Sequence, residues 1–193
     1  MLIFTMNISE RKEMNQSIFI EGEKLSIDQV LKNKDQRAYL QQEIFQKYPH
    51  DTLLDIKLNI PGPIKNNSYL ENIFYAGISE LEQALAKNKL PFVLLQSHNQ
   101  PAGCENFYLL TADKIEVKKV AIEFEDSAPL NRLFDADVLV KNKKQALSRS
   151  EIGYSGRKCF LCKRPAKDCA RSRRHSVQEL QNYISNLYKK TFS

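Results

Sequence analysis

Two aspartates, Asp135 and Asp137, are the residues whose spacing first suggests chemistry. An apolar run, 138–140, follows them, and in a strand alternate side chains share a face, so both carboxylates would point one way while Ala136 points into a core. Two such charges repel unless a cation lies between them, and a divalent ion prefers hard oxygen ligands. Arg132, just upstream, could hold a phosphate bound to that ion. An ordinary solvated strand edge is the alternative.

A second group with the spacing of a metal site lies near the C-terminus: Cys159, Cys162, Cys169 and His175. Thiolates and imidazole suit tetrahedral Zn²⁺, and the gap between Cys159 and Cys162 is typical of a zinc knuckle. Because four protein ligands would fill the ion's coordination, the site would be structural rather than catalytic. Free thiols, or a redox pair of Cys159 and Cys162, are alternatives, and His175 could instead cap the helix that follows.

Positive charge is concentrated around this cysteine cluster. The chain has a net charge of +6, and residues 157–175 hold eight Lys or Arg against one acid, Asp168. Such a segment attracts a polyanion, which could be a nucleic acid, a phosphorylated cofactor or an acidic protein. Phe160 is the one aromatic residue there, so the segment offers little surface on which bases could stack.

The turn at residues 61–65 has two features of a phosphate site. Gly62 would let the backbone approach a ligand closely, and Lys65 lies just before the N-terminus of a predicted helix, where an anion is stabilised. A solvated loop lysine is the alternative reading of Lys65.

The elements that must position these residues follow from the hydrophobic periodicity. Helices are expected over 26–31, 36–48, 68–85 and 177–187, and residues 112–126 favour a helix over a strand. Strands are expected over 53–60, 92–96, 107–110, 135–140 and 146–149.

This order of elements predicts an α+β fold: a ferredoxin-like or palm-like sheet (strand-helix-strand-strand-helix-strand) with its helices on one face. The expected boundaries are a loosely ordered lead-in over 1–25, a catalytic domain over 26–150 that begins with a helical segment, and a basic Cys3His zinc segment with a C-terminal helix over 151–193. No apolar run is long enough to span a bilayer and the start lacks a signal-peptide layout. We therefore expect a cytoplasmic protein without a membrane partner.

Four separated motifs in one order resemble a known family. They are Asn59-Ile-Pro-Gly-Pro-Ile-Lys65, Pro129-Leu-Asn-Arg-Leu-Phe-Asp-Ala-Asp-Val138, Leu147-Ser-Arg149, and Arg157-Lys-Cys-Phe-Leu-Cys162 with its continuation to His175. Over about residues 26–187 the chain is similar to the apo-citrate lyase phosphoribosyl-dephospho-CoA transferases, also called citrate lyase holo-acyl-carrier-protein synthases.

The resemblance implies a transfer reaction. The donor would be 2′-(5″-triphosphoribosyl)-3′-dephospho-CoA, the acceptor a serine on the acyl carrier subunit of citrate lyase, and pyrophosphate would be released. The basic zinc segment would suit docking of an acidic carrier protein. Two alternatives are a nucleotidyltransferase that uses an ordinary nucleoside triphosphate and a zinc-containing nucleic-acid-binding module; our expectation is a transferase without a nucleic-acid partner.

A physical reading of this reaction then assigns roles to individual residues. Asp135 and Asp137 would hold a catalytic Mg²⁺, and Glu123 would be a further ligand or base, whereas the Zn²⁺ would be structural. The donor's triphosphate would be held by basic side chains and the glycine turn: Arg132, Arg149, Lys65 and Gly62.

Overall fold

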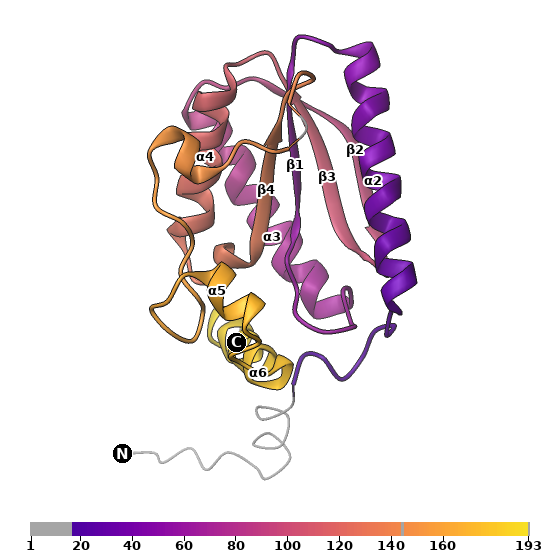
Figure 1. Ribbon diagram of the computed structural model, residues 1–193, viewed down its shortest axis with the longest axis vertical. Coiled ribbons are helices and arrows are strands. Elements are labelled where there is room, and N and C mark those ends of the chain that lie inside the picture. The colour runs from indigo at the N-terminus through magenta and orange to yellow at the C-terminus, as the bar shows by residue number, and fades with distance from the viewer. Residues whose placement is uncertain (1–16, 144, 193) are drawn as a thin grey trace, which may run out of the picture.

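The computed structural model describes residues 17–143 and 145–192 (Figure 1). The described elements, in chain order, are α2 (Ile27–Lys47), β1 (Thr52–Leu58), α3 (Ser68–Lys87), β2 (Phe92–Gln100), β3 (Gly103–Leu110), α4 (Lys114–Ser127), the 3₁₀ turn η1 (Asn131–Leu133), β4 (Phe134–Leu139), the 3₁₀ turn η2 (Arg149–Ile152), α5 (Ala166–Arg171) and α6 (Val177–Phe192). Most of the predicted lead-in over 1–25 lies outside the described residues.

The four strands form one antiparallel sheet in the order β2-β3-β1-β4. The predicted succession of strand, helix, strand, strand, helix and strand is confirmed by β1 to β4 with α3 and α4 between them. Residues 112–126 do form a helix, as favoured. The predicted strand over 146–149 is wrong, because that segment leads into η2 and leaves β4 as the sheet's edge.

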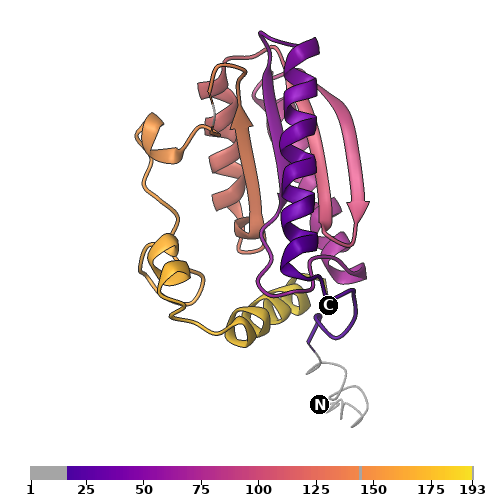
Figure 2. The ribbon, with the colours of Figure 1, turned by 45° about the vertical axis from the view of Figure 1, so that its right-hand side comes forward.

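The helices cover both faces of the sheet rather than one. Figures 1 and 2 show α3 and α4 behind the sheet and α2 across its opposite face. The main core lies on the first side, where Leu54 and Ile56 of β1 pack with α3 and α4, whereas Leu53 packs on the other side with Ile44 of α2 and Phe107 of β3. The expectation of helices on one face is therefore wrong. Odd-numbered residues of β1, such as Leu53, face the other side of the sheet, and α2 covers them there.

Helix α2 is continuous, although two separate helices were expected in this region. Ser26 and Gln29 form a capping box at its start. Ile27 and Tyr39 are 79% and 63% exposed, and Ile44 is the buried residue of the helix. Arg37 and Gln41 also lie on the side of α2 that faces the sheet, where their side chains contact charged residues of the strands.

Helix α3 shows the predicted amphipathic pattern, with seven buried residues on one side. Its N-cap is Asn67, whose side-chain oxygen accepts a hydrogen bond from the Leu70 backbone at 2.9 Å. Gly77 allows close contact with Phe134, since a Cβ atom there would lie 2.3 Å from the Phe134 ring. This contact fixes α3 against the start of the strand that carries the two aspartates.

The C-terminal helix α6 lies across the end of the sheet where β1 stops and β4 begins (Figures 1 and 2). Ile184 is buried, and Gln181 donates a hydrogen bond to the Pro61 carbonyl at 3.0 Å. Ser185 accepts one from the Ile18 backbone at 3.2 Å. Ile18 is 2% exposed and belongs to the main core, and Phe19 and Leu25 are buried as well, whereas residues 20–24 are exposed.

Candidate active site and metal centre

Asp135 and Asp137 lie on one face of β4, as their spacing predicted. The Nζ atom of Lys57 lies 2.8 Å from Asp137 Oδ2 and 3.4 Å from Asp135 Oδ2. Lys57 reaches both because β1 and β4 pair in a register that sets Lys57 opposite Asp135 and Asp55 opposite Asp137. The two carboxylates are about one-third exposed, so the pair is open to solvent on the face that α2 crosses.

Neighbouring charges keep Asp135 and Lys57 ionised. Burial alone would raise the pKa of Asp135, but Lys57 and Arg157 outweigh it, and the pKa lies below its usual range. Burial likewise acts to lower the pKa of Lys57, but Asp55, Asp137 and Asp135 together raise it. At neutral pH the cluster therefore contains a charged ammonium ion between carboxylates.

Asp55, beside this pair on β1, has a different environment because α2 seals it from solvent. Gln41 donates a hydrogen bond to its Oδ2 at 2.7 Å, and Arg37 Nε lies 3.8 Å from the same atom. Arg37 also pairs with Glu105 of β3. Burial raises the pKa of Asp55 to about 8, with Lys57 acting against that rise and Glu105 adding to it. Asp55 can therefore hold a proton at a pH where Asp135 does not.

The free edge of β4 is held by two buried side chains of α4. At Ala136, the residue between the aspartates, Glu125 Oε1 accepts a hydrogen bond from the backbone nitrogen at 2.8 Å, and Lys118 Nζ donates one to the carbonyl at 2.9 Å. Glu125 and Lys118 are 1% and 5% exposed. The pKa of Lys118 is lowered by burial, which Glu125 opposes. These bonds satisfy edge groups that would otherwise be unpaired, and they fix the backbone that carries both carboxylates.

Glu125 also binds two arginines. Its Oε2 accepts a hydrogen bond from Arg149 at 2.6 Å, and Arg157 contacts its Oε1. Arg157 continues to the Phe134 carbonyl at 2.9 Å and to Asp135 Oδ1 at 3.4 Å. Glu123, the predicted ligand or base, lies on the exposed side of α4, because two positions along a helix turn a side chain to the opposite side. The role of Glu123 as a ligand or base stays a prediction.

Arg149 and Arg157 line a basic cavity of about 530 Å³. Its cationic lining comes from Arg132, Arg149, Arg157, Lys158 and Lys163, with Asp126 as the acid among its lining residues. Arg132 donates a hydrogen bond to the Lys158 carbonyl at 2.7 Å, and its guanidinium lies 5.0 Å from the centre of the Phe160 ring. The structure thus brings Arg132 and Arg149 together as predicted, and adds Arg157. A concave site with this charge is suited to a polyphosphate.

Gly62 and Lys65 do not line this basic cavity among the described residues. Gly62 has a φ of +89°, and a Cβ there would meet Gln181 and Val177 of α6 at 2.7 and 2.8 Å. The close approach predicted for a ligand is therefore made by α6. Lys65 donates to the Ile60 carbonyl at 2.6 Å, and burial lowers its pKa.

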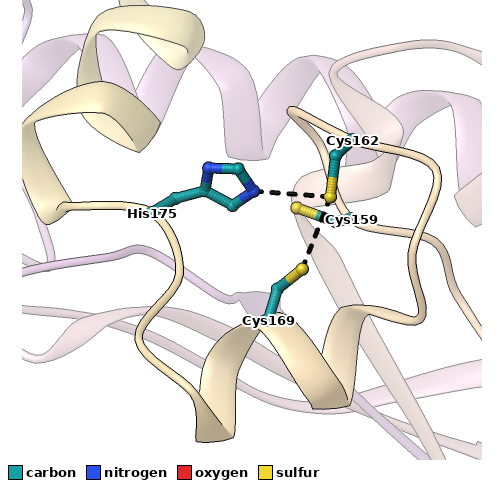
Figure 3. Close-up of side chains that lie close together, drawn as sticks. All are labelled: Cys159, Cys162, Cys169 and His175. Carbon is teal, nitrogen blue, oxygen red and sulfur yellow. Dashed lines mark hydrogen bonds between the residues drawn. The ribbon is translucent and has the colours of Figure 1, made fainter.

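Cys159, Cys162, Cys169 and His175 converge from a turn, α5 and the segment before α6 (Figure 3). Their ligand atoms lie within 4.8 Å of one another. The Cys162 and Cys169 sulfurs are 3.5 Å apart, and His175 Nε2 is 3.4 Å from Cys162 Sγ. Tetrahedral Zn²⁺ with bonds of about 2.3 Å to sulfur separates its ligands by about 3.8 Å, so this donor set fits the ion. His175 also lowers the pKa of Cys162 to about 6.

The Cys3His group borders two cavities. Cys159 lies between Lys158 and Phe160, and both Cys159 and Cys162 line the basic cavity. On its other side, Cys159, Cys169 and His175 line a more apolar cavity of about 520 Å³ that reaches Gly62 and α6. A metal bound here would therefore fix the wall of the basic cavity.

Several residues of this site were missed by sequence reasoning: Asp55, Lys57, Lys118, Glu125 and Arg157. Charged residues at alternate strand positions 55 and 57 were a signal, because that period turns both toward one face. A glutamate and a lysine at buried positions of a helical pattern were a second signal. Neither signal shows which residue of another element each charged side chain contacts.

Comparisons with known proteins point to one family. The model of the apo-citrate lyase phosphoribosyl-dephospho-CoA transferase family matches residues 25–191. A Streptococcus pyogenes protein named probable apo-citrate lyase phosphoribosyl-dephospho-CoA transferase is 35% identical over 185 residues, which cover 93% of this chain and 94% of that protein. A Shigella boydii protein named apo-citrate lyase phosphoribosyl-dephospho-CoA transferase is 31% identical over 163 residues, covering 84% and 88%. Protein CitXG of Leuconostoc mesenteroides is 34% identical over 170 residues, covering 88% of this chain and 36% of that longer protein.

No helix in the described ranges combines the length and apolar character that a bilayer span needs.

Proposed function

Because this chain belongs to the apo-citrate lyase phosphoribosyl-dephospho-CoA transferase family, we propose that it attaches that group to a serine of the acyl carrier subunit of citrate lyase. The chain is a transferase that acts on apo-citrate lyase. The family favours this reaction over the two alternatives expected from the sequence, an ordinary nucleotidyltransferase and a nucleic-acid-binding module. No nucleic-acid partner is proposed, since Phe160 is the one aromatic residue of the basic segment 157–175 and offers little surface on which bases could stack.

In the proposed reaction the donor is 2′-(5″-triphosphoribosyl)-3′-dephospho-CoA. The serine oxygen forms a bond to the α-phosphorus, and the bond from that phosphorus to the oxygen bridging to the β-phosphate breaks. Pyrophosphate leaves with the bond's electron pair, and the serine hydroxyl gives up its proton to solvent. The protein must hold the attacking serine oxygen and the leaving bridging oxygen in line on opposite sides of the α-phosphorus. It must also stabilise the negative charge that develops on the leaving pyrophosphate.

The observation that carries this proposal is the position of Asp135 and Asp137 beside a cavity lined with arginines. Both Oδ2 atoms point at one site, where they contact Lys57, and Arg157 extends from Asp135 into the cavity lining. Two partly exposed carboxylates are hard oxygen donors that fit Mg²⁺. A bound Mg²⁺ would neutralise charge on the donor phosphates and on departing pyrophosphate.

Arg132, Arg149 and Arg157 are proposed to hold the triphosphate. Arg149 pairs with Glu125 and Asp126, and these bonds raise its pKa despite its partial burial, so it stays cationic. Arg132 is oriented by Phe160 and the Lys158 carbonyl. The predicted contact of Lys65 with the donor stays a prediction.

The Cys3His group is proposed to hold a structural Zn²⁺, because all four protein ligands would be used. The exposed lysines and arginines of the same segment would receive an acidic carrier subunit. A thiolate site of this kind requires reduced cysteines, which supports the cytoplasmic location expected from the sequence. The strand order β2-β3-β1-β4 with two crossover helices supports a ferredoxin-like, palm-like arrangement for residues 52–139.

The proposal is tested by weighing the acceptor. Purified protein is incubated with the apo acyl carrier subunit, Mg²⁺ and either the triphosphoribosyl donor or ATP, and the carrier's intact mass is measured. We expect a gain equal to the prosthetic group with the first donor and none with ATP. A carrier whose acceptor serine is replaced by alanine is the control and should gain nothing. A gain with ATP alone, or with neither donor, would overturn the proposal.

A further inference from the structure

Lys57 occupies the position between the two carboxylates that a divalent ion would use. Its ammonium contacts the Oδ2 atoms of both Asp135 and Asp137, at 3.4 and 2.8 Å. The Lys57 side chain is 17% exposed, and it is held on the face by its strand position opposite Asp135. This arrangement is built from β1 and β4 together and does not depend on a flexible loop.

The remaining oxygen of Asp135 is also close to a cation, since Arg157 lies 3.4 Å from its Oδ1. Asp135 is therefore between Lys57 and Arg157, and the pair is already neutralised by side chains of the protein. An ion bound to both Oδ2 atoms would lie about 2.1 Å from each of them. Two cations sharing the same two oxygens repel strongly at such short separation.

We propose that Lys57 is a built-in counter-ion of the aspartate pair that a divalent cation must displace, so that the metal binds tightly only together with the phosphates of the donor. This inference rests on the proposed assignment of Mg²⁺ to Asp135 and Asp137. The triphosphate supplies negative charge for both cations: the displaced ammonium gains a phosphate partner and the metal gains the carboxylates. Without a bound polyphosphate, Lys57 and Arg157 cancel most of the negative charge of Asp135 and Asp137 that would attract a metal.

The inference predicts that removing the ammonium strengthens metal binding to the donor-free protein. Mn²⁺ is the probe, because its unbound fraction is measured directly by electron paramagnetic resonance and its heat of binding by calorimetry. The zinc-loaded protein is used, so that the cysteine site is filled. We expect Lys57→Gln and Lys57→Met to bind Mn²⁺ at least about tenfold more tightly than the wild-type protein.

Three further variants make the experiment specific. Lys57→Arg keeps the charge and should leave Mn²⁺ affinity near that of the wild type. Lys87→Gln removes an exposed lysine at the end of α3 and should also leave it unchanged, which controls for the loss of one net charge. The double variant Lys57→Gln/Asp137→Asn should lose the gain, because the metal would lack one of its ligands.

The outcomes separate this inference from the proposed function. If Lys57→Gln and Lys57→Met retain the wild-type circular dichroism spectrum and bind Mn²⁺ no more tightly, Lys57 is not a competitor and the inference is wrong. If Asp137→Asn retains the wild-type rate of transfer to the carrier subunit, the metal assignment itself is wrong. Loss of transfer in Asp137→Asn with unchanged Mn²⁺ affinity in the Lys57 variants would overturn only the inference.

Discussion

The carboxylate of Glu125 accepts a hydrogen bond from the backbone nitrogen of Ala136 at 2.8 Å. Ala136 lies between the two aspartates, and the same glutamate binds Arg149 and Arg157, which line the basic cavity. One buried side chain thus joins the strand that would hold the metal to the arginines that would hold the phosphates. Its removal should disturb both the stability of the fold and the geometry of the site.

We expect Glu125→Gln to lower the free energy of unfolding by about 2–4 kcal/mol, because Arg149 and Arg157 would each lose one of their two anionic partners. Urea denaturation followed by circular dichroism measures the change. Glu123→Gln, on the exposed side of the same helix, is the matched control and should change stability by less than about 0.5 kcal/mol. Equal effects of the two substitutions would contradict the role of Glu125.

Asp135→Asn and Asp137→Asn should each reduce transfer by about a thousandfold or more, since either change removes a metal ligand and its charge from the reacting centre. Initial rates come from the mass of the carrier subunit, and circular dichroism checks the fold. Asp35→Asn, an exposed aspartate on α2, should transfer at the wild-type rate. A folded Asp137→Asn protein with a normal rate would refute the assignment.

Arg132→Met should weaken competitive inhibition by pyrophosphate roughly tenfold and raise the KM for the donor, because the cavity would lose an oriented cation. Inhibition constants at fixed Mg²⁺ provide the measurement. Arg171→Met changes an exposed arginine of the same basic segment outside the cavity lining and should alter neither value. Similar changes in both variants would indicate a general charge effect.

Thiol reactivity should distinguish the Cys3His group from Cys104. With Zn²⁺ bound at pH 8 we expect no rapid reaction with a disulfide reagent. After chelation all three thiols of the group should react, Cys162 first because its pKa is lowered to about 6 and Cys169 last because burial raises its pKa to about 11. Burial raises the pKa of Cys104 to about 11, so at pH 8 roughly one molecule in a thousand carries its thiolate. Its reaction should accelerate about tenfold per pH unit up to about pH 11.

Cys104→Ser serves as the control for that experiment, because it should leave the number of chelator-released thiols at three. Two outcomes would count against the metal centre: all three cysteines reacting before chelation, or fewer than three reacting after it. A fast reaction at Cys104 in the folded protein at pH 8 would show that its side chain is not shielded.

Gly62→Ala should destabilise the protein more than Gly153→Ala. Both glycines have positive φ, at +89° and +83°, so the backbone strain of about 1 kcal/mol is shared. A Cβ at Gly62 would also press on Gln181 and Val177, whereas nothing lies within 4 Å of one at Gly153. We expect a difference of about 1–2 kcal/mol in urea denaturation. Equal losses would show that α6 adjusts without cost.

Features that depend on neighbouring residues could be predicted from the sequence. The shared direction of Asp135 and Asp137 follows from the two-residue period of a strand. The spacing of Cys159, Cys162 and Cys169 predicted a group that does converge with His175. The order of β1 to β4 with α3 and α4 between them was likewise confirmed, because each of these patterns is complete within one element.

Tertiary structure alone decided which residues meet across elements. The contact of Glu125 with Ala136 depends on how α4 is rotated against β4, and the position of Lys57 depends on the register of β1 and β4. The contact of Gly62 with α6 joins segments far apart in the chain. Periodicity shows which side chains share a face. It does not show what covers that face, because register and helix rotation are set by packing between segments far apart in the sequence.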